Sequence, residues 1–106
     1  MEDELAAAIA SATLEMERTM PATLMGISFL VEDVPTAVEL RNARGVCPLG
    51  RYLRGNPSTV VLYRKPIEAR CADRSALDRL VRDTLAELVG SLAGVTPDRV
   101  VPGYGL

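Results

Sequence analysis

The chain has 106 residues, of which 48% are hydrophobic and 25% charged, with a net charge of −2 and no histidine. This length suits one domain with one hydrophobic core, so we expect residues 1–106 to form a single domain. The small net charge gives no bulk attraction to nucleic acid or to membranes. The missing histidine excludes Ser-His-Asp and Cys-His catalysis, and the imidazole ligands of most zinc, copper and non-haem iron sites.

The first part of the chain predicts a helix and then a strand. Apolar residues recur at steps of three and four over residues 2–20, which is typical of an amphipathic helix. Acidic residues in its first turn suit the helix dipole, and Pro21 is expected to end the helix. The alternating segment "MGISFLVEDVP" then predicts a strand over about residues 26–32.

The middle of the chain has the weakest pattern. The segment "TAVELRNA" fits either a short strand or a helical turn. The segment "RGVCPLGRYLRGNPS" holds three glycines and two prolines, which predicts mostly loop. The clearest strand is the β-branched segment "TVVLYR" at residues 59–64, and Pro66 is expected to end it.

A long amphipathic helix is predicted next, from a cap at Asp73 or Ser75 to a stop at Gly94. A short helical turn should follow with Thr96 as its cap and Pro97 as its first residue, before a loose tail "PGYGL". This order of elements predicts an α+β fold in which the N-terminal helix and the long C-terminal helix pack on one face of a small sheet.

Carboxylates on and after the long helix offer one candidate site. Asp83 and Glu87 are four residues apart and should share a helix face. Oxygen ligands of this kind suit magnesium or manganese. The alternative is a solvated helix face whose charge is offset by nearby arginines. The residues of this possible cation site are Asp78, Asp83, Glu87 and Asp98.

Basic residues gather in the middle of the chain. Residues 1–38 carry one basic and seven acidic side chains, whereas residues 39–70 carry seven basic and two acidic ones. An anion, an acidic peptide or RNA could bind the basic segment, although it could also be simply solvated. Four aromatic residues are few for a stacking platform, so the sequence favours a protein or peptide partner over nucleic acid. The possible anion-binding residues are Arg41, Arg44, Arg51 and Arg54.

Cys47 and Cys71 match no zinc-site spacing, and we expect two free thiols in a reducing cytoplasm. Arg70 could lower the pKa of Cys71 and make it reactive, or Cys71 could be a packed, inert thiol. The first apolar run is too short to cross a bilayer, so we expect no membrane partner. Exposed strand edges leave open a homo-oligomer.

Three segments of the chain share their order with a known family. They are a strand and acidic turn, "ISFLVEDVP"; a strand–turn–helix block, "PSTVVLYRKPIEARCADRSALDRLVRDTLAEL"; and a closing turn, "GVTPDRV". In these segments the chain resembles the small bacterial zincin-like metallopeptidases. The resemblance implies a zincin-like fold in which the long helix of this chain stands where the family has its active-site helix.

The resemblance also implies where the family's zinc site would lie. The family helix carries His-Glu-x-x-His, whose histidines grip zinc while the glutamate activates water. With Gly94 aligned on the family's glycine, Glu87 and Ser91 stand in the places of the two histidines. Leu88 stands in the place of the glutamate and Pro97 in that of the third ligand.

All four functional positions therefore differ from the family. We expect a catalytically inactive member without zinc or another cofactor, acting as an interaction or regulatory module for an unidentified protein or peptide. The alternatives are a hydrolase with a carboxylate-held cation, or anion or nucleic-acid binding through residues 41–54.

Two further expectations concern an edge strand beside the cleft and the packing of the long helix. The family has an apolar, glycine-containing strand beside its cleft, expected here near residues 40–45, where the chain reads "LRNARG". The resemblance leaves open whether this edge strand exists. Gly90 costs helix stability relative to alanine, so we expect it to mark close packing of the helix against a strand.

Overall fold

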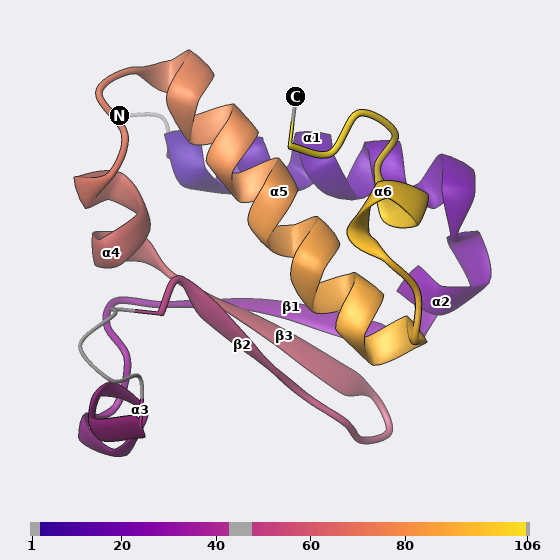
Figure 1. The fold of residues 1–106 in the computed structure, drawn as a ribbon, viewed down its shortest axis with the longest axis horizontal. Coiled ribbons are helices and arrows are strands. Elements are labelled where there is room, and N and C mark those ends of the chain that lie inside the picture. The colour runs from indigo at the N-terminus through magenta and orange to yellow at the C-terminus, as the bar shows by residue number, and fades with distance from the viewer. Residues whose placement is uncertain (1–2, 43–47, 106) are drawn as a thin grey trace.

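A computed structural model describes residues 3–42 and 48–105. Helices α1 and α5 cross one face of a three-stranded sheet, with α2 and α6 towards one end of that layer and α4 towards the other (Figure 1). The short helix α3 lies on the opposite side of the sheet. The helices are α1 (Glu4–Thr19), α2 (Pro21–Met25), α3 (Ala37–Asn42), α4 (Arg64–Ala69), α5 (Arg74–Ala93) and α6 (Pro97–Val100).

The sheet has the strand order β1-β3-β2, with β1 at Ile27–Glu32, β3 at Ser58–Tyr63 and β2 at Gly50–Leu53. Strand β1 runs parallel to β3, and β2 runs antiparallel to it. Val60 and Leu62 of the central strand point into the core beneath the helices. Because side chains alternate along a strand, Val61 and Tyr63 stand on the other face, which we call the outer face. The mixed sheet under two helices confirms the predicted α+β fold.

Strand β2 lies within residues 44–58, the segment predicted to be mostly loop, and that prediction did not include it. It has only four residues, bounded by Gly50 and followed by Gly55, and its letters show no clear alternation. Its partner β3 supplies the hydrogen bonds that make it a strand, so the pairing and not the local pattern decides its structure. An edge strand therefore exists at Gly50–Leu53; of residues 40–45, where the family would have it, 40–42 belong to α3 and 43–45 lie outside the described residues.

The connections hold two helices that the sequence prediction lacked or left open. Arg64 begins α4 directly after β3, so Pro66 lies inside a helix instead of ending a strand. Residues 37–42, for which the sequence left a short strand or a helical turn open, form the helix α3. Thr36 Oγ1 accepts a hydrogen bond from the Glu39 N–H at 3.2 Å, and the Thr36 hydroxyl donates to Glu39 Oε1 at 3.0 Å. This reciprocal cap, with its T-x-x-E signature, starts α3.

The residues that cap and end α1 and α5 agree with the prediction in part. Asp3, expected in the first turn of α1, instead caps it by accepting hydrogen bonds from the next amides. Asp73, one of the two predicted residues, caps α5. Gly94 adopts the left-handed conformation at φ 73°, as predicted for a helix stop. Pro21 ends α1 and also begins α2.

The C-terminal segment is docked instead of loose, which corrects the prediction for "PGYGL". The Tyr104 N–H donates to the Val101 carbonyl at 3.2 Å, and the half-buried Tyr104 side chain packs against the core. The predicted short helix is confirmed as α6, which begins at Pro97 with Thr96 at its N-cap position.

Gly90 allows close packing, although against a turn and not against a strand. A Cβ atom at Gly90 would lie 2.8 Å from the Val95 carbonyl oxygen and 3.6 Å from the Pro97 nitrogen. The Val95 N–H donates back to the Gly90 carbonyl at 2.9 Å. Gly90 thus lets the α5–α6 connection fold tightly against the helix.

We predict that Gly90→Ala destabilises the protein. Alanine favours a helix by about 1 kcal/mol over glycine, but the forced contact with the Val95 carbonyl should reverse this and lower the free energy of unfolding by about 1–3 kcal/mol. Chemical denaturation measures the change. Gly26→Ala is the matched control, because its Cβ would lie 3.7 Å from the nearest atom, and an equal loss in both variants contradicts the prediction.

We also predict an acid-dependent contribution from Asp3. A hydrogen bond from Arg64, with those of the Ala6 and Leu5 amides, lowers the pKa of Asp3 from 3.8 to about 2. The stabilising contribution is therefore present above pH 4 and lost as the pH falls through about 2. Asp3→Asn keeps a capping residue but removes the titration.

Thermal unfolding between pH 5 and 2 measures the difference. The loss of stability on acidification should be smaller in Asp3→Asn than in the wild type, with the two curves converging at the acid end. Curves that remain parallel across this range would contradict the assignment.

Candidate functional site

The four positions implied by the family resemblance lie around the C-terminal end of α5. Glu87 and Ser91 are four residues apart on the helix, and both are exposed. Leu88 is half-buried between the helix and the sheet. Pro97 begins α6, just beyond the turn that follows Gly94.

A shallow pocket of about 290 Å³ lies where α5, the start of β2 and the segment after α4 come together. Glu87 and Leu88 line it, whereas Ser91 and Pro97 do not. Its remaining lining residues are Pro48, Leu49, Gly50, Arg70 and Thr84. Two of the four positions therefore share one concave surface with the edge strand.

Leu88 packs directly on the edge strand. A Cβ atom at Gly50 would lie 3.0 Å from Leu88 Cδ1 and 3.1 Å from Leu62 Cδ2. It would also lie only 2.5 Å from the Val61 carbonyl oxygen, so residue 50 must be glycine for this approach. An apolar side chain thus fills the space beside Gly50 of β2.

Glu87 is held by the C-terminal segment. The Tyr104 hydroxyl donates a hydrogen bond to Glu87 Oε2, and the Gly105 N–H donates to Asp83 Oδ1 at 3.4 Å. The hydrogen bond to Glu87, together with burial, raises the pKa of Tyr104 from 10 to about 12. The segment after α6 therefore closes over the exposed face of α5 at the first of the four positions.

Arg54 ties the β2–β3 hairpin to the end of α5. Its Nη1 donates to the Leu92 carbonyl at 3.0 Å, and its Nη2 donates to the Ser91 carbonyl at 2.9 Å. The guanidinium also lies 5.9 Å from the centre of the Tyr52 ring. A cation that caps the last carbonyls of a helix is favourable for the helix dipole. The structure thus gives Arg54 a structural contact beside Ser91.

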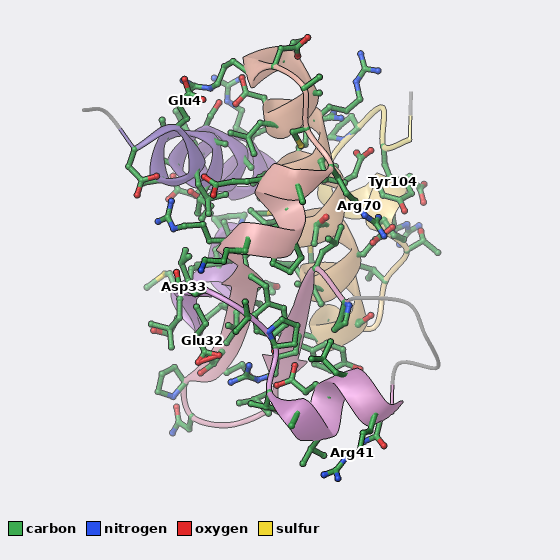
Figure 2. All side chains as sticks on the ribbon, turned by 90° about the vertical axis from the view of Figure 1, so that its left-hand side faces the viewer. Glu4, Glu32, Asp33, Arg41, Arg70 and Tyr104 are labelled. Carbon is green, nitrogen blue, oxygen red and sulfur yellow. The ribbon has the colours of Figure 1, made fainter. Side chains whose placement is uncertain are left out.

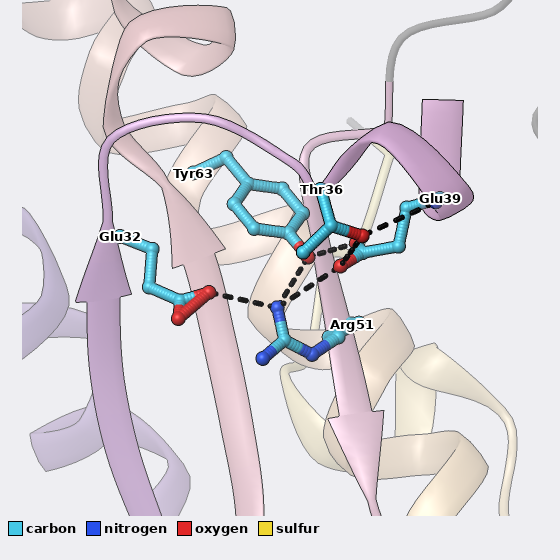
Figure 3. Close-up of polar contacts among 5 residues, drawn as sticks. All are labelled: Glu32, Thr36, Glu39, Arg51 and Tyr63. Carbon is cyan, nitrogen blue, oxygen red and sulfur yellow. Dashed lines mark hydrogen bonds and ion pairs between the residues drawn. The ribbon is translucent and has the colours of Figure 1, made fainter. Parts of the chain in front are cut away.

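Arg51 lies on the outer face, in the polar cluster of Figure 3. Its Nη1 donates to Glu32 Oε1 at 2.8 Å, to the Tyr63 hydroxyl oxygen at 2.5 Å and to Glu39 Oε1 at 3.3 Å. The Tyr63 hydroxyl itself donates to Glu39 Oε2. This cluster fastens α3 to the ends of all three strands.

The charges and hydrogen bonds of the cluster shift the pKa values of its members. Burial and the hydrogen bond to Glu39 raise the pKa of Tyr63 from 10 to about 12. Hydrogen bonds from Tyr63 and Thr36 lower the pKa of Glu39, although burial opposes them. The hydrogen bonds to Glu32 and Tyr63 raise the pKa of Arg51 above its ordinary value. Arg51 is thus a fixed cation between two carboxylates.

The four arginines of the predicted anion site are not gathered on one surface. Arg51 points to the outer face, and Arg54 reaches α5 on the helix side. Arg41 is exposed at the end of α3, and Arg44 lies outside the described residues. The alternation of side chains along and just after β2 explains the separation of Arg51 from Arg54.

The carboxylates of the predicted cation site are also separate. Asp78 pairs with Arg74 at 3.0 Å, while Asp98 is exposed on α6. Within residues 3–42 and 48–105, no group of three or more Asp, Glu or Cys side chains is placed to hold a metal ion. Asp83 and Glu87 do share the face that the C-terminal segment covers.

Cys71 is half-buried in the segment between α4 and α5. Burial, with the nearby charge of Asp73, raises the pKa of its thiol. The expectation that Arg70 lowers this pKa is wrong, and the structure favours the inert, packed thiol. Cys47 lies outside the described residues.

The geometry can now be compared with known proteins. A small mixed sheet with an edge strand beside a long helix that ends in a left-handed glycine is consistent with a zincin-like fold. A family model described as zincin-like metallopeptidase matches residues 24–104. The chain belongs to this family. No curated protein matches the chain.

Across the part of the chain that the structure describes, no helix is both long enough and apolar enough to cross a bilayer.

We predict that Glu87 controls the ionisation of Tyr104. The difference in phenolate absorbance between the wild type and Tyr104→Phe should titrate near pH 12, because the donated hydrogen bond favours the protonated phenol. The same difference measured in a Glu87→Ala background should titrate closer to pH 10. Far-UV circular dichroism recorded at each pH checks that the protein stays folded.

The hydrogen bond from Tyr104 to Glu87 also makes a pH-dependent contribution to the free energy of unfolding. It is present below pH 10 and lost as the pH rises through about 12. An unchanged midpoint after Glu87→Ala would mean that the Tyr104 hydroxyl does not donate a hydrogen bond to Glu87.

Proposed function

We propose that this chain is a catalytically inactive zincin-like domain that serves as an interaction or regulatory module for a protein or peptide partner. One observation carries the proposal: Leu88 packs on Gly50, and the resemblance assigns to Leu88 the place of the family's general base. Zinc-dependent peptide hydrolysis needs a group that takes a proton from the bound water. A leucine side chain cannot take one.

The other three positions support the same conclusion. Glu87 and Ser91 each retain an oxygen, but Glu87 already accepts a hydrogen bond from Tyr104. Pro97 has no side-chain atom that can bind a metal ion. A catalytic zinc site needs three protein ligands, and these four positions offer at most two side chains that could bind zinc.

The part of the scaffold that could still bind a partner is the edge of β2. The Tyr63 N–H donates to the Leu49 carbonyl at 2.9 Å, so the main-chain groups of Leu49 face β3. The alternation of the antiparallel ladder then turns the N–H and C=O groups of Gly50 and Tyr52 away from the sheet. An extended peptide could add to this edge as a strand, next to the pocket lined by Leu88 and Arg70.

The proposal includes a bacterial setting, which rests on the family resemblance, and a cytoplasmic one, which rests on the expectation of two free thiols. The two alternative functions have no comparable support. The described carboxylates do not form a cation site, and Arg51 and Arg54 are engaged on different sides of the sheet.

Rebuilding the zinc site tests the proposal. The wild type, stripped of metal and dialysed against zinc, should retain no stoichiometric zinc and cleave no unstructured protein substrate. The variant Glu87→His, Leu88→Glu, Ser91→His and Pro97→Asp restores the family's residue types at the four positions. It should retain about one zinc per chain, because two histidines four residues apart on a helix face one ion.

A matched control places histidines four residues apart elsewhere, as Ala10→His with Leu14→His on exposed positions of α1. Elemental analysis should show weaker zinc retention in the control than in the rebuilt variant. Stoichiometric zinc in the wild type that disappears in Glu87→Ala would overturn the proposal, as would zinc-dependent proteolysis by the wild type.

A further inference from the structure

The free edge of β2 ends, at the start of the strand, in a proline. Strand β2 is the last in the sheet order, so no described strand pairs with its far side. Because Leu49 faces β3, the main-chain groups of Gly50 and Tyr52 point to the free side. The preceding outward position is Pro48, which has no N–H. Gly50 therefore carries the last main-chain donor at this end of the edge.

A residue that pairs with Gly50 directs its side chain into the pocket beside α5. Residues directly opposite each other in a sheet point their side chains to the same face. A Cβ atom at Gly50 would lie 3.0 Å from Leu88 Cδ1, so position 50 faces the helix side. The pocket of about 290 Å³ lies there, and the half-buried Leu49 and Leu88 line it. An apolar side chain opposite Gly50 fits this lining.

The same pocket holds an arginine without a partner. Arg70 follows α4, is exposed and lines the pocket. Its side chain has no hydrogen bond or ion pair within residues 3–42 and 48–105. In the view of Figure 2, Arg70 lies on the side of Tyr104, away from the acidic Glu32 and Asp33 at the end of β1. A free guanidinium offers paired N–H donors that match a carboxylate.

Glu87 is the acidic residue that lines the pocket. Its carboxylate accepts a hydrogen bond from the Tyr104 hydroxyl, and among the described residues no ion pair joins it to Arg70. The cation therefore stays available to a ligand, while the fixed carboxylate repels a negative charge that is placed anywhere but at Arg70. Such an arrangement selects the position of the ligand's charge as well as its sign.

We propose that the peptide partner ends in this pocket, with its C-terminal residue paired to Gly50, that residue's apolar side chain beside Leu88 and its terminal carboxylate on Arg70. This inference rests on the proposed function, whose partner it describes chemically. The peptide runs antiparallel to β2, because only this direction brings a C-terminus to the start of the strand. A parallel peptide would bring its terminal ammonium group towards Arg70.

The end of the free edge explains why the carboxylate is the terminal one. An acidic side chain inside a longer segment would require the peptide to continue past Gly50. Pro48 provides no N–H for that continuation. A peptide that stops at Gly50 uses the last donor of the edge and still places its carboxylate beside the pocket.

Selection from random peptides tests this chemistry. Two pools of short synthetic peptides of random sequence, one with free C-terminal carboxylates and one with C-terminal amides, are passed over the immobilised full chain. The free-acid pool should give binders with an apolar last residue, and the amide pool should give none of comparable affinity.

Fluorescence polarisation then measures the best binder, labelled at its N-terminus. Amidation should weaken binding at least about tenfold, which is about 1.4 kcal/mol. Arg70→Ala should weaken the free acid by a similar factor and leave the amide unchanged, because the lost contact is made only by the carboxylate. Arg79→Ala on α5 is the matched control, since Arg79 is exposed and lines a different groove, and it should change neither affinity.

A nitroxide group at the N-terminus of the same peptide tests the direction. In NMR spectra of the complex it should broaden the amide signal of Leu53 more than that of Leu49, because the N-terminus of an antiparallel peptide lies towards the end of β2. Stronger broadening at Leu49 would contradict the antiparallel arrangement. Circular dichroism checks that every variant is folded.

Three results overturn the proposal: no binder from the free-acid pool, an amide that binds as tightly as its acid, or an Arg70→Ala change that weakens both equally. Binders that keep an internal acidic residue and tolerate amidation also overturn it, in favour of a side-chain carboxylate. These readouts are separate from the zinc experiment. Zinc retention by the wild type would overturn the proposed inactivity without altering them, and failed peptide selection would leave that inactivity standing.

Discussion

The packing of α5 across the helix-side face of the sheet is the constraint on which the rest of the structure depends. Buried residues recur along the helix at steps of four, at Leu77, Val81, Leu85 and Val89. They meet Val60 and Leu62 of the central strand in one apolar core. Removing one such side chain typically costs 2–5 kcal/mol. Once this stripe is fixed, helix geometry sets the direction of every other residue on α5, including Glu87, Leu88 and Ser91.

The elements with strong local patterns could be predicted from the sequence. Strands β1 and β3 show alternation or β-branched residues, and the α5 pattern is periodic up to Gly94, whose left-handed conformation follows from its type. Strand β2 and the docked C-terminal segment could not be predicted, because each depends on a partner elsewhere in the chain. The start of α3 is different, since the Thr36–Glu39 capping signature was present and would have decided between helix and strand.

The candidate site, too, could be predicted from the sequence only in part. The resemblance pointed to Glu87, Leu88 and Ser91 in the last turns of the long helix and to Pro97 just after it, but it said nothing of what surrounds them. Tyr104 reaches Glu87 from 17 residues further along, and Arg54 reaches the Ser91 carbonyl across 37 residues. Likewise, counting charge along the sequence indicated a basic loop, whereas the fold places Glu32, 19 residues before Arg51, directly against its guanidinium.

Helix α1 lies before residues 24–104, the region that the family model matches. Yet Leu5, Ala8, Ala12 and Met16 of this helix are buried in the same core as α5, and the Arg82 guanidinium on α5 pairs with Glu15 at 3.0 Å. A fragment cut at the family boundary would expose one whole flank of α5 to water. The hydrophobic core therefore extends beyond the residues that the family model matches, and α1 supplies one side of it.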